Sequence, residues 1–189
     1  MKIILASSSP ARRQQLQQLK LKFTSISPNI DETPYPEEKA ADLVQRLAKT
    51  KAMTIAPQVT NAIIIAGDQV GVNQEQIIGK PHTETKAIEQ LMASSGKKLI
   101  FYSGLTVLNT ITNQIDTTVV TTEVSFRDLS LNEITAYIKK AQPLNCAGSF
   151  NIDGMGIILF KQITSDDPSA LLGLPLIQLT TLLKTHHVL

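Results

Sequence analysis

Two short segments near the start of the chain carry residue types that could bind phosphate. Ser7-Ser8-Ser9-Pro10 follows an apolar run and precedes a helical pattern, so free backbone N–H groups and the positive end of a helix meet there. Arg12 falls in the first turn of that helix, where its guanidinium could clasp two phosphate oxygens. A capped surface helix with solvated arginines is the commoner meaning of such a pattern. Taken alone, this segment leaves both interpretations open.

Acidic side chains stand at two further points of the sequence. Asp31-Glu32 lies in a proline-flanked loop, and two adjacent carboxylates can serve a divalent cation or position a water. Asp68 directly follows Gly67 at the end of the most apolar strand pattern. Ligands of open α/β sheets collect outside the carboxyl ends of strands, so a carboxylate there suits a general base or a metal ligand. A solvated acidic loop and an aspartate that caps a turn are the plain alternatives.

Two lysines complete the set of candidate residues. Lys51 falls on the apolar stripe of a helix, four residues after Leu47 and four before Ile55. Such a lysine either runs along the surface or points into a cleft that holds an anion. Lys80 sits in the turn Gly79-Lys80-Pro81, where a plain exposed lysine is the alternative. Cations, carboxylates and a serine-rich helix start together suit a polyphosphate with a divalent cation.

Other enzyme chemistries are disfavoured by what the sequence lacks. None of its 3 histidines has a convincing nucleophile partner, which argues against a serine hydrolase. The sequence contains neither a Walker-A pattern nor Gly-x-Gly-x-x-Gly, which argues against a P-loop kinase and a dinucleotide fold.

Hydrophobic periodicity indicates the elements that must position these residues. The expected strands are Lys2–Ala6, Phe23–Ser27, 62–66, 99–108, 117–126 and 156–160. The expected helices are 10–19, 37–55, 84–94, 131–140 and 175–184, with Ser9, Thr83 and Ser130 as N-caps. Strands and helices alternate early, and an antiparallel strand pair follows. This order predicts an α/β class with a mixed sheet.

Composition limits the remaining possibilities. A 189-residue chain with 42% hydrophobic residues can bury a core, and we expect a single domain over residues 1–189. A net charge of +2 argues against a nucleic-acid partner, and one cysteine excludes an internal disulfide. Every apolar run falls short of the roughly 20 residues that span a bilayer, and the apolar start is too short for a signal peptide. A cytoplasmic protein without a membrane partner is expected.

Several short segments form an ordered set over nearly the whole chain. They are Leu5–Pro10 with Arg12-Arg13, Asp31–Pro34, Lys49–Ala52, Gly67–Gln69, Gly79–Pro81, Asp167–Ser169 and Gly173–Leu176. In this order they resemble the Maf family of nucleoside triphosphate pyrophosphatases, and the set is specific although each piece is weak. The resemblance implies an elongated α/β fold of Maf/ITPase type, with a mixed sheet flanked by helices and a deep central cleft. It also implies a nucleoside triphosphate as substrate, with a homodimer as one assembly.

The resemblance further implies a role for each matching residue. The reaction would be hydrolysis between the α and β phosphates, assisted by a divalent metal cation (Mg or Mn). Asp68 would accept the proton of the attacking water and, with Glu32, hold the metal. The residues that would line the phosphate and metal site are Ser7, Arg12, Glu32, Lys51 and Lys80.

Three segments resemble the branch of the family that hydrolyses 7-methyl-GTP: Gly67–Gln69, Ser103–Leu105 and Cys146–Phe150. Gln69 stands where the dTTP/UTP branch typically has Thr, and Ala11 where that branch has a further Arg. Asp153 could favour the positive charge of an N7-methylated guanine and accept its N–H groups. Some members of the branch carry Trp where this chain has Ala11, so another residue, such as Phe150, would have to stack on the base. A dTTP/UTP pyrophosphatase and a non-catalytic nucleotide-binding module are the rival interpretations.

Overall fold

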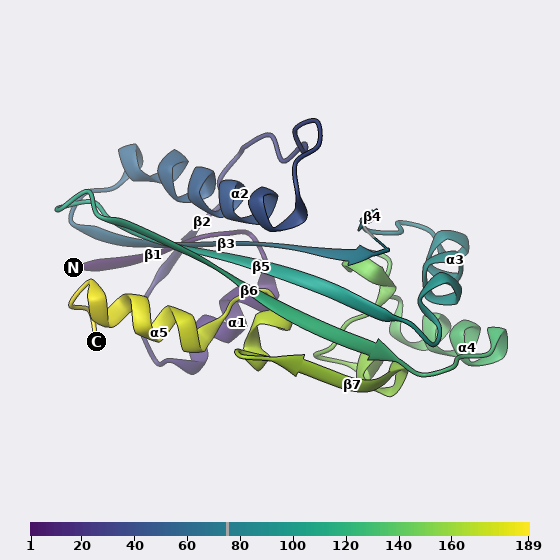
Figure 1. The fold of residues 1–189 in the computed structure, drawn as a ribbon. Coiled ribbons are helices and arrows are strands. Elements are labelled where there is room, and N and C mark those ends of the chain that lie inside the picture. Colours follow the sequence, from purple (N-terminus) through teal and green to yellow (C-terminus); the bar gives the residue numbers. More distant parts are fainter. Residues whose placement is uncertain (75) are drawn as a thin grey trace. The chain divides into compact units, whose positions relative to one another are not determined.

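Helices pack on a mixed sheet in the computed structural model, which describes residues 1–74 and 76–189 (Figure 1). Within these residues seven strands form one sheet in the order β2-β1-β3-β5-β6-β7, and β4 pairs with β3. The strands are β1 (Lys2–Ala6), β2 (Thr24–Ile26), β3 (Ala62–Asn73), β4 (Gln76–Ile78), β5 (Lys98–Asn109), β6 (Ile115–Phe126) and β7 (Phe160–Ser165). β1 runs parallel to β2 and β3, whereas β4 and β7 run antiparallel to their neighbours. The predicted α/β class with a mixed sheet is confirmed.

Five α-helices and four short 3-10 helices occur in the same residues. The α-helices are α1 (Pro10–Gln18), α2 (Ala40–Ile55), α3 (Glu84–Ser94), α4 (Leu131–Ala141) and α5 (Leu176–Thr185). The 3-10 helices are η1 (Ala56–Gln58), η2 (Ala147–Ser149), η3 (Met155–Leu159) and η4 (Pro168–Leu172). Ser9, Thr83 and Ser130 cap their helices as predicted, and Ser130 forms a complete capping box with Glu133.

The chain divides into two compact units. Unit 1 comprises Met1–Gln69, Tyr102–Val120 and Asp166–Leu189; unit 2 comprises Val70–Phe101 and Thr121–Ser165. Strands β3, β5 and β6 contribute residues to both units. The single domain expected from the sequence stays a prediction.

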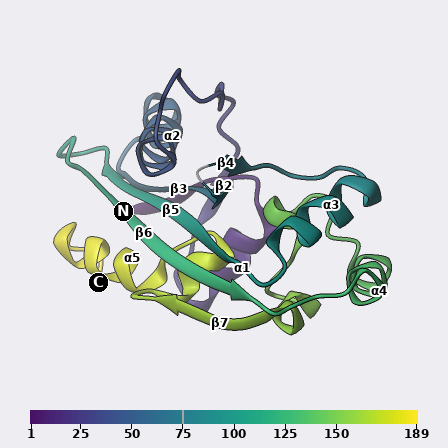
Figure 2. The same ribbon diagram turned by 45° about the vertical axis from the view of Figure 1, so that its right-hand side comes forward.

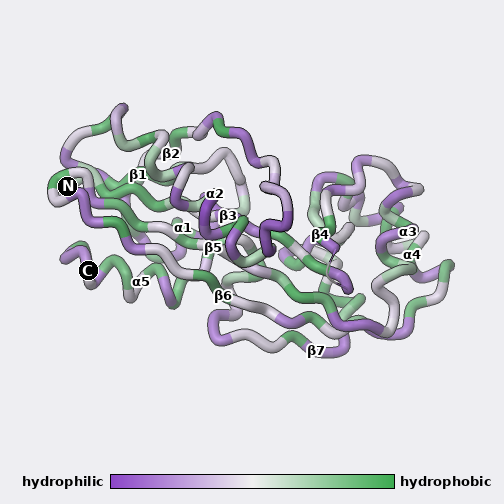
Figure 3. The backbone as a smooth tube through the Cα atoms, turned by 45° about the horizontal axis from the view of Figure 1, so that its top comes forward, coloured by the Kyte–Doolittle hydropathy of each residue, from purple (hydrophilic) through white to green (hydrophobic). Residues whose placement is uncertain are grey.

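Unit 1 places apolar side chains on both faces of its strands. Alternate residues of β3 point to opposite faces because the side-chain period of a strand is two. Ala62, Ile64 and Ala66 join a cluster with Ala52 and Ile55 of α2. The intervening Ile63 and Ile65 join a second cluster with α1 and α5, through Leu16, Leu179 and Leu183. Helices therefore cover both faces, as Figure 2 shows, and the hydrophobic colour follows β1 and β3 in Figure 3.

Unit 2 is built around aromatic rings and a helix pair. Phe101, Phe126, Phe150 and Phe160 meet edge to face, with ring centroids 4.8–5.8 Å apart. This arrangement is favourable because the positive edge of one ring meets the negative face of the next. Helices α3 and α4 pack against each other beside this cluster.

Several predicted boundaries differ from the structure, and three elements differ by three residues or more at one end. The strand predicted at 156–160 is wrong, because residues 155–159 form the 3-10 helix η3 and the strand begins at Phe160. Gly156 lies so close to Asn151 that a Cβ would fall 2.4 Å from the Asn151 carbonyl oxygen. The backbone at this contact is helical and not extended. The helix predicted from Glu37 begins at Ala40, because Glu37 has a φ of +60° that a right-handed helix does not accept. Strand β3 continues to Asn73.

Gly104 of β5 allows helix α2 to approach the sheet closely. A Cβ at this position would lie 2.3 Å from the carbonyl oxygen of Val44. We predict that Gly104→Ala lowers the free energy of unfolding by about 1–3 kcal/mol, because overpacking forces the helix away from the strand. Urea denaturation would measure this change. Gly79→Ala is the matched control, since a Cβ added there would have no heavy atom of the described residues within 4 Å apart from its chain neighbours. An equal loss in both variants would contradict the prediction.

Candidate active site

The serine loop follows β1, which ends at Ala6 and runs parallel to the first part of β3. The register of the two strands pairs Ile4 with Ile64 and Leu5 with Ile65. The expectation that Asp68 follows the end of a strand is wrong, because β3 continues to Asn73 and Asp68 lies within it.

Ser7 is buried, and its hydroxyl oxygen accepts the Ser9 N–H at 3.1 Å. Ser9 caps α1 by accepting the Arg12 N–H at 3.3 Å. The Ser7 N–H donates to the Leu5 carbonyl at 2.9 Å, so three N–H groups of the loop and the helix start are used within the protein. The loop is tightly folded at a helix start, whose positive dipole end favours anions.

Arg12 leaves α1 and is anchored to the segment before α5. Its Nε donates to the Gly173 carbonyl at 2.8 Å, and Gly67 lies beside it, where a Cβ would come within 3.6 Å of Nε. Burial lowers the pKa of the guanidinium, and the nearby charges of Asp68 and Glu32 act against that shift. Since Nε is occupied, the two terminal nitrogens are the part of the fork that remains to grip an anion.

Lys51 joins two of the predicted carboxylates. Its Nζ lies 2.6 Å from Oδ1 of Asp68 and 2.6 Å from Oε1 of Glu32. Lys51 and Asp68 are each only 6% exposed, whereas the Glu32 side chain is 59% exposed. The lysine on the apolar stripe thus points inward to anions rather than along the surface. The ammonium has three donors, and these two contacts leave the third for another acceptor.

The loop that carries Glu32 is held against α2. Arg46 of α2 bonds both carboxylate oxygens of Glu38, at 2.6 and 2.7 Å, and donates to the Thr33 carbonyl at 3.1 Å. Its guanidinium lies 3.9 Å from the centre of the Tyr35 ring. The Arg46 contact lowers the pKa of Glu38 to about 2. These contacts fix the loop whose Glu32 reaches Lys51.

Burial governs the protonation of Asp68. It raises the pKa of the carboxyl above its ordinary value, while the charges of Lys51 and Arg12 lower it and that of Glu32 raises it further. A carboxylate whose pKa is raised binds a proton more readily than one in water. This property is what a general base requires.

Gln69 lies on the opposite side of β3 from Asp68. Asp68 continues the series Ala62, Ile64 and Ala66 that faces α2, whereas the Gln69 amide contacts the η4 segment. Its Nε2 donates to Ser103 Oγ at 3.0 Å, the Ala170 carbonyl at 2.8 Å and the Leu171 carbonyl at 3.1 Å.

The remaining predicted residues are placed individually. Ala11 is half-buried in the first turn of α1. Lys80 and Asp153 are exposed residues of unit 2, and their roles stay predictions. Phe150 is 6% exposed within the aromatic cluster, so its ring is packed inside unit 2 rather than free to stack on a base. The structure therefore argues against Phe150 as the stacking residue.

A network that sequence reasoning did not assign supports the site from the 167–174 segment. The buried Asp167 carboxylate accepts bonds from Ser169 and from the Gln178 N–H of α5. Gln15 Nε2 donates to the carbonyls of Ser169 and Leu174, which ties α1 to the segment that also anchors Arg12. Asp167–Ser169 is one of the segments that resemble the Maf family, but the sequence does not show which residues it contacts.

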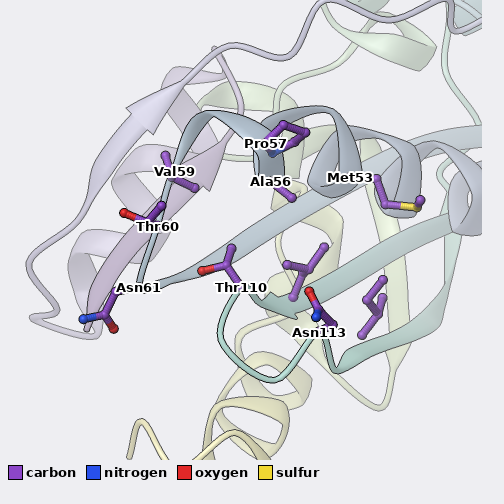
Figure 4. Close-up of a pocket in the computed structure, with 10 residues that line it drawn as sticks. Met53, Ala56, Pro57, Val59, Thr60, Asn61, Thr110 and Asn113 are labelled. Carbon is purple, nitrogen blue, oxygen red and sulfur yellow. The ribbon is translucent and has the colours of Figure 1, made fainter.

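One pocket of unit 1 lies away from these residues. It has a volume of about 420 Å³ and lies between the end of α2 and the β5–β6 hairpin, with Met53, Asn61 and Thr110 among its lining residues (Figure 4). Asp68 is six residues along β3 from Ala62, a distance of about 20 Å at the rise of a strand. None of the predicted site residues lines this pocket.

The two carboxylates beside Lys51 are candidate ligands for a divalent cation. Mg²⁺ is usually held by one or two carboxylates together with substrate phosphates and waters. Asp68 and Glu32 each lie 2.6 Å from Lys51 Nζ, so two carboxylates, the number that such an ion usually takes from the protein, are close together beside this ammonium. Among residues 1–74 and 76–189 no group of three or more His, Cys, Asp or Glu side chains could hold a metal without further ligands.

The chain belongs to the Maf family. The family described as "Maf-like protein" matches residues 2–186, nearly the entire chain. The match agrees with the resemblance carried by the short motifs.

Several curated relatives carry the same name. Proteins named "7-methyl-GTP pyrophosphatase" from Nitrosococcus oceani, Hydrogenovibrio crunogenus and Aliivibrio fischeri are 47%, 49% and 47% identical to this chain. The alignments cover 96–97% of this chain and 92–95% of the relatives.

Solved structures show weaker likeness. The crystal structure of a nucleoside-triphosphatase (dITP/XTP pyrophosphatase) from Mycobacterium abscessus has a TM-score of 0.43 and 14% identity, covering 68% of this chain and 76% of that one. The Ham1 protein of Staphylococcus aureus has a TM-score of 0.48 and 17% identity, covering 68% of this chain and 73% of that one. Because both TM-scores lie below 0.5, these likenesses support no conclusion about this chain. Separately, no helix in the described part of the chain is long and apolar enough to cross a membrane.

The raised pKa of Asp68 predicts a cost in stability. Between the ordinary value of 3.8 and the raised value, the folded chain binds more protons at this site than the unfolded chain. The free energy of unfolding therefore falls as the pH rises through that window, and the loss persists at neutral pH. We predict that Asp68→Asn is more stable than the wild type at about pH 7 and that the difference shrinks toward about pH 4.

Denaturation curves at several pH values would measure this difference. Asp42→Asn is the control, because Asp42 is an exposed aspartate of α2. A loss of stability in Asp68→Asn at neutral pH would contradict the sign of the shift.

Proposed function

We propose that this protein hydrolyses 7-methyl-GTP to 7-methyl-GMP and pyrophosphate. The observation that carries the proposal is the buried Lys51–Asp68 pair joined to Glu32, in a chain 47–49% identical to relatives of that name. A buried carboxylate with a raised pKa, close to a guanidinium and a helix start, supports phosphate chemistry more than a purely structural role.

In this mechanism water attacks the α-phosphorus of the substrate. Asp68 accepts the proton of the attacking water, and the bond from the α-phosphorus to the bridging oxygen breaks. Pyrophosphate leaves with the bonding electron pair. The terminal nitrogens of Arg12, the third donor of Lys51 and the Ser7 loop bind the phosphate oxygens, so catalysis is mainly electrostatic. Lys80 is assigned to the leaving phosphates on the family resemblance.

Asp68 and Glu32 are the residues that would hold a divalent metal cation. When bound, such an ion polarises phosphoryl oxygens and offsets the charge that develops on the leaving group. Lys51 keeps both carboxylates at one point before substrate arrives, since each would otherwise repel the other.

Recognition of the base is assigned to three residues. A methyl group on N7 gives guanine a positive charge, which an exposed carboxylate such as Asp153 favours. Gln69 adds an amide contact. Ala11 has a small side chain at the start of α1, where some members of the branch carry Trp.

We predict that the purified protein releases pyrophosphate from 7-methyl-GTP with a higher kcat/KM than from GTP, dTTP or UTP. A pyrophosphate-release assay over these four nucleotides, with added Mg²⁺ or Mn²⁺ and after treatment with EDTA, measures both the preference and the metal requirement. A preference for dTTP or UTP would assign the chain to the other branch. Ligand-induced stabilisation without pyrophosphate release would make it a nucleotide-binding module.

We predict that Asp68→Asn lowers kcat by about 10²–10⁴-fold, the usual loss when a positioned base is removed. The variant should remain folded, because asparagine has nearly the same shape as the protonated carboxyl. Asp42→Asn, on the exposed side of α2, should retain wild-type turnover. Near-wild-type turnover in Asp68→Asn would remove Asp68 from the mechanism.

A further inference from the structure

The amide of Gln69 is held in one orientation by three oxygen atoms, which share the two N–H donors of Nε2. Two of them are the backbone carbonyls of Ala170 and Leu171, at 2.8 and 3.1 Å from Nε2. A carbonyl oxygen accepts hydrogen bonds and cannot donate them, so the NH₂ end of the amide must face this segment. The opposite orientation would place the amide oxygen against two other oxygens.

Ser103 completes this arrangement. It is fully buried in β5, and its hydroxyl donates to the Ala170 carbonyl at 2.8 Å. The hydroxyl proton is thereby committed, and the oxygen presents a lone pair to Gln69 Nε2 at 3.0 Å. Ser103 therefore favours the same orientation of the Gln69 amide as the two carbonyls do.

The Gln69 oxygen, Oε1, is left as the outward end of the amide. Among residues 1–74 and 76–189 no donor bonds to it, although the side chain is half-buried. A fixed oxygen of this kind accepts N–H donors and repels acceptors. Guanine offers adjacent N–H donors on its Watson–Crick edge, whereas uracil offers a single N–H between two carbonyls.

We propose that Ser103 is a positioning residue for base selection, which holds the Gln69 amide so that its oxygen reads the N–H groups of a guanine-type base. The inference rests on the proposed function. Ser103 contacts no substrate in this arrangement; it acts through Gln69. Loss of its hydroxyl leaves the amide with fewer constraints on its rotation, and a buried supporting contact of this kind determines how well a recognition group is oriented.

The first experiment compares Ser103→Ala with the wild type. The ratio of kcat/KM for 7-methyl-GTP to that for UTP should fall about 3- to 10-fold, the effect of one weakened hydrogen bond. The change should lie in KM for 7-methyl-GTP, with kcat altered less than about twofold, because the contact binds ground state and transition state alike. Thr106→Val is the matched control: it removes a buried hydroxyl from the same strand, one that pairs with Thr117.

A double-mutant cycle with Gln69→Met tests whether Ser103 acts through Gln69. Methionine keeps the length of the side chain but cannot donate to the three oxygens. If Ser103 acts through the amide, Ser103→Ala should leave the ratio unchanged in the Gln69→Met background. Thermal unfolding of each variant reports stability separately, so a general loss of folding is recognised.

Several outcomes would overturn the inference. These are an unchanged ratio in Ser103→Ala or in Gln69→Met, an equal fall in both backgrounds, and a matching fall in Thr106→Val. In each of these cases hydrolysis of 7-methyl-GTP by the wild type leaves the proposed function intact. Absence of pyrophosphate release by the wild type overturns the proposed function and the inference with it.

Discussion

The ammonium group of Lys51 allows two carboxylates to lie close together. Asp68 is buried at the end of an apolar strand series, and Glu32 extends from an exposed loop. Removing an ionised carboxylate from water is costly, and a second one nearby increases the cost. With Arg12, the cluster holds two cations and two anions, so it is balanced before any phosphate binds. Contacts around the cluster hold these four groups in place. Arg46 fixes the loop that carries Glu32, and the Gly173 carbonyl anchors Arg12.

The sequence predicted which residues belong to this site better than it predicted the contacts that hold them in place. Apolar periodicity located β3 and α2, and it singled out Lys51 because a charged residue interrupts an apolar stripe. Side-chain caps predicted three helix starts, because Ser and Thr satisfy N–H groups within three residues of themselves. Such local signals depend only on neighbours in the chain.

Long-range contacts carry no comparable signal. The bond from Arg12 to Gly173 spans 161 residues, and that from Gln69 to Ala170 spans 101. Backbone carbonyls accept these bonds, and a carbonyl is the same in every residue type. Ser103 belongs to a segment that resembles the 7-methyl-GTP branch, but its contacts with Gln69 and Ala170 could not be predicted from the sequence. The strand expected at 156–160 failed for a similar reason, since the approach of Gly156 to Asn151 is a tertiary contact.

Alternation along β3 has an evolutionary consequence. Asp68 and Gln69 are consecutive, yet a strand turns them toward opposite faces. On the roles proposed here, hydrolysis depends on the environment under α2, and base preference depends on the environment beside η4. Substitutions accumulating on one side can retune which nucleotide is destroyed while leaving the bond-breaking groups untouched. Insertion or loss of a single residue in β3 would instead exchange the two environments and abolish both properties at once.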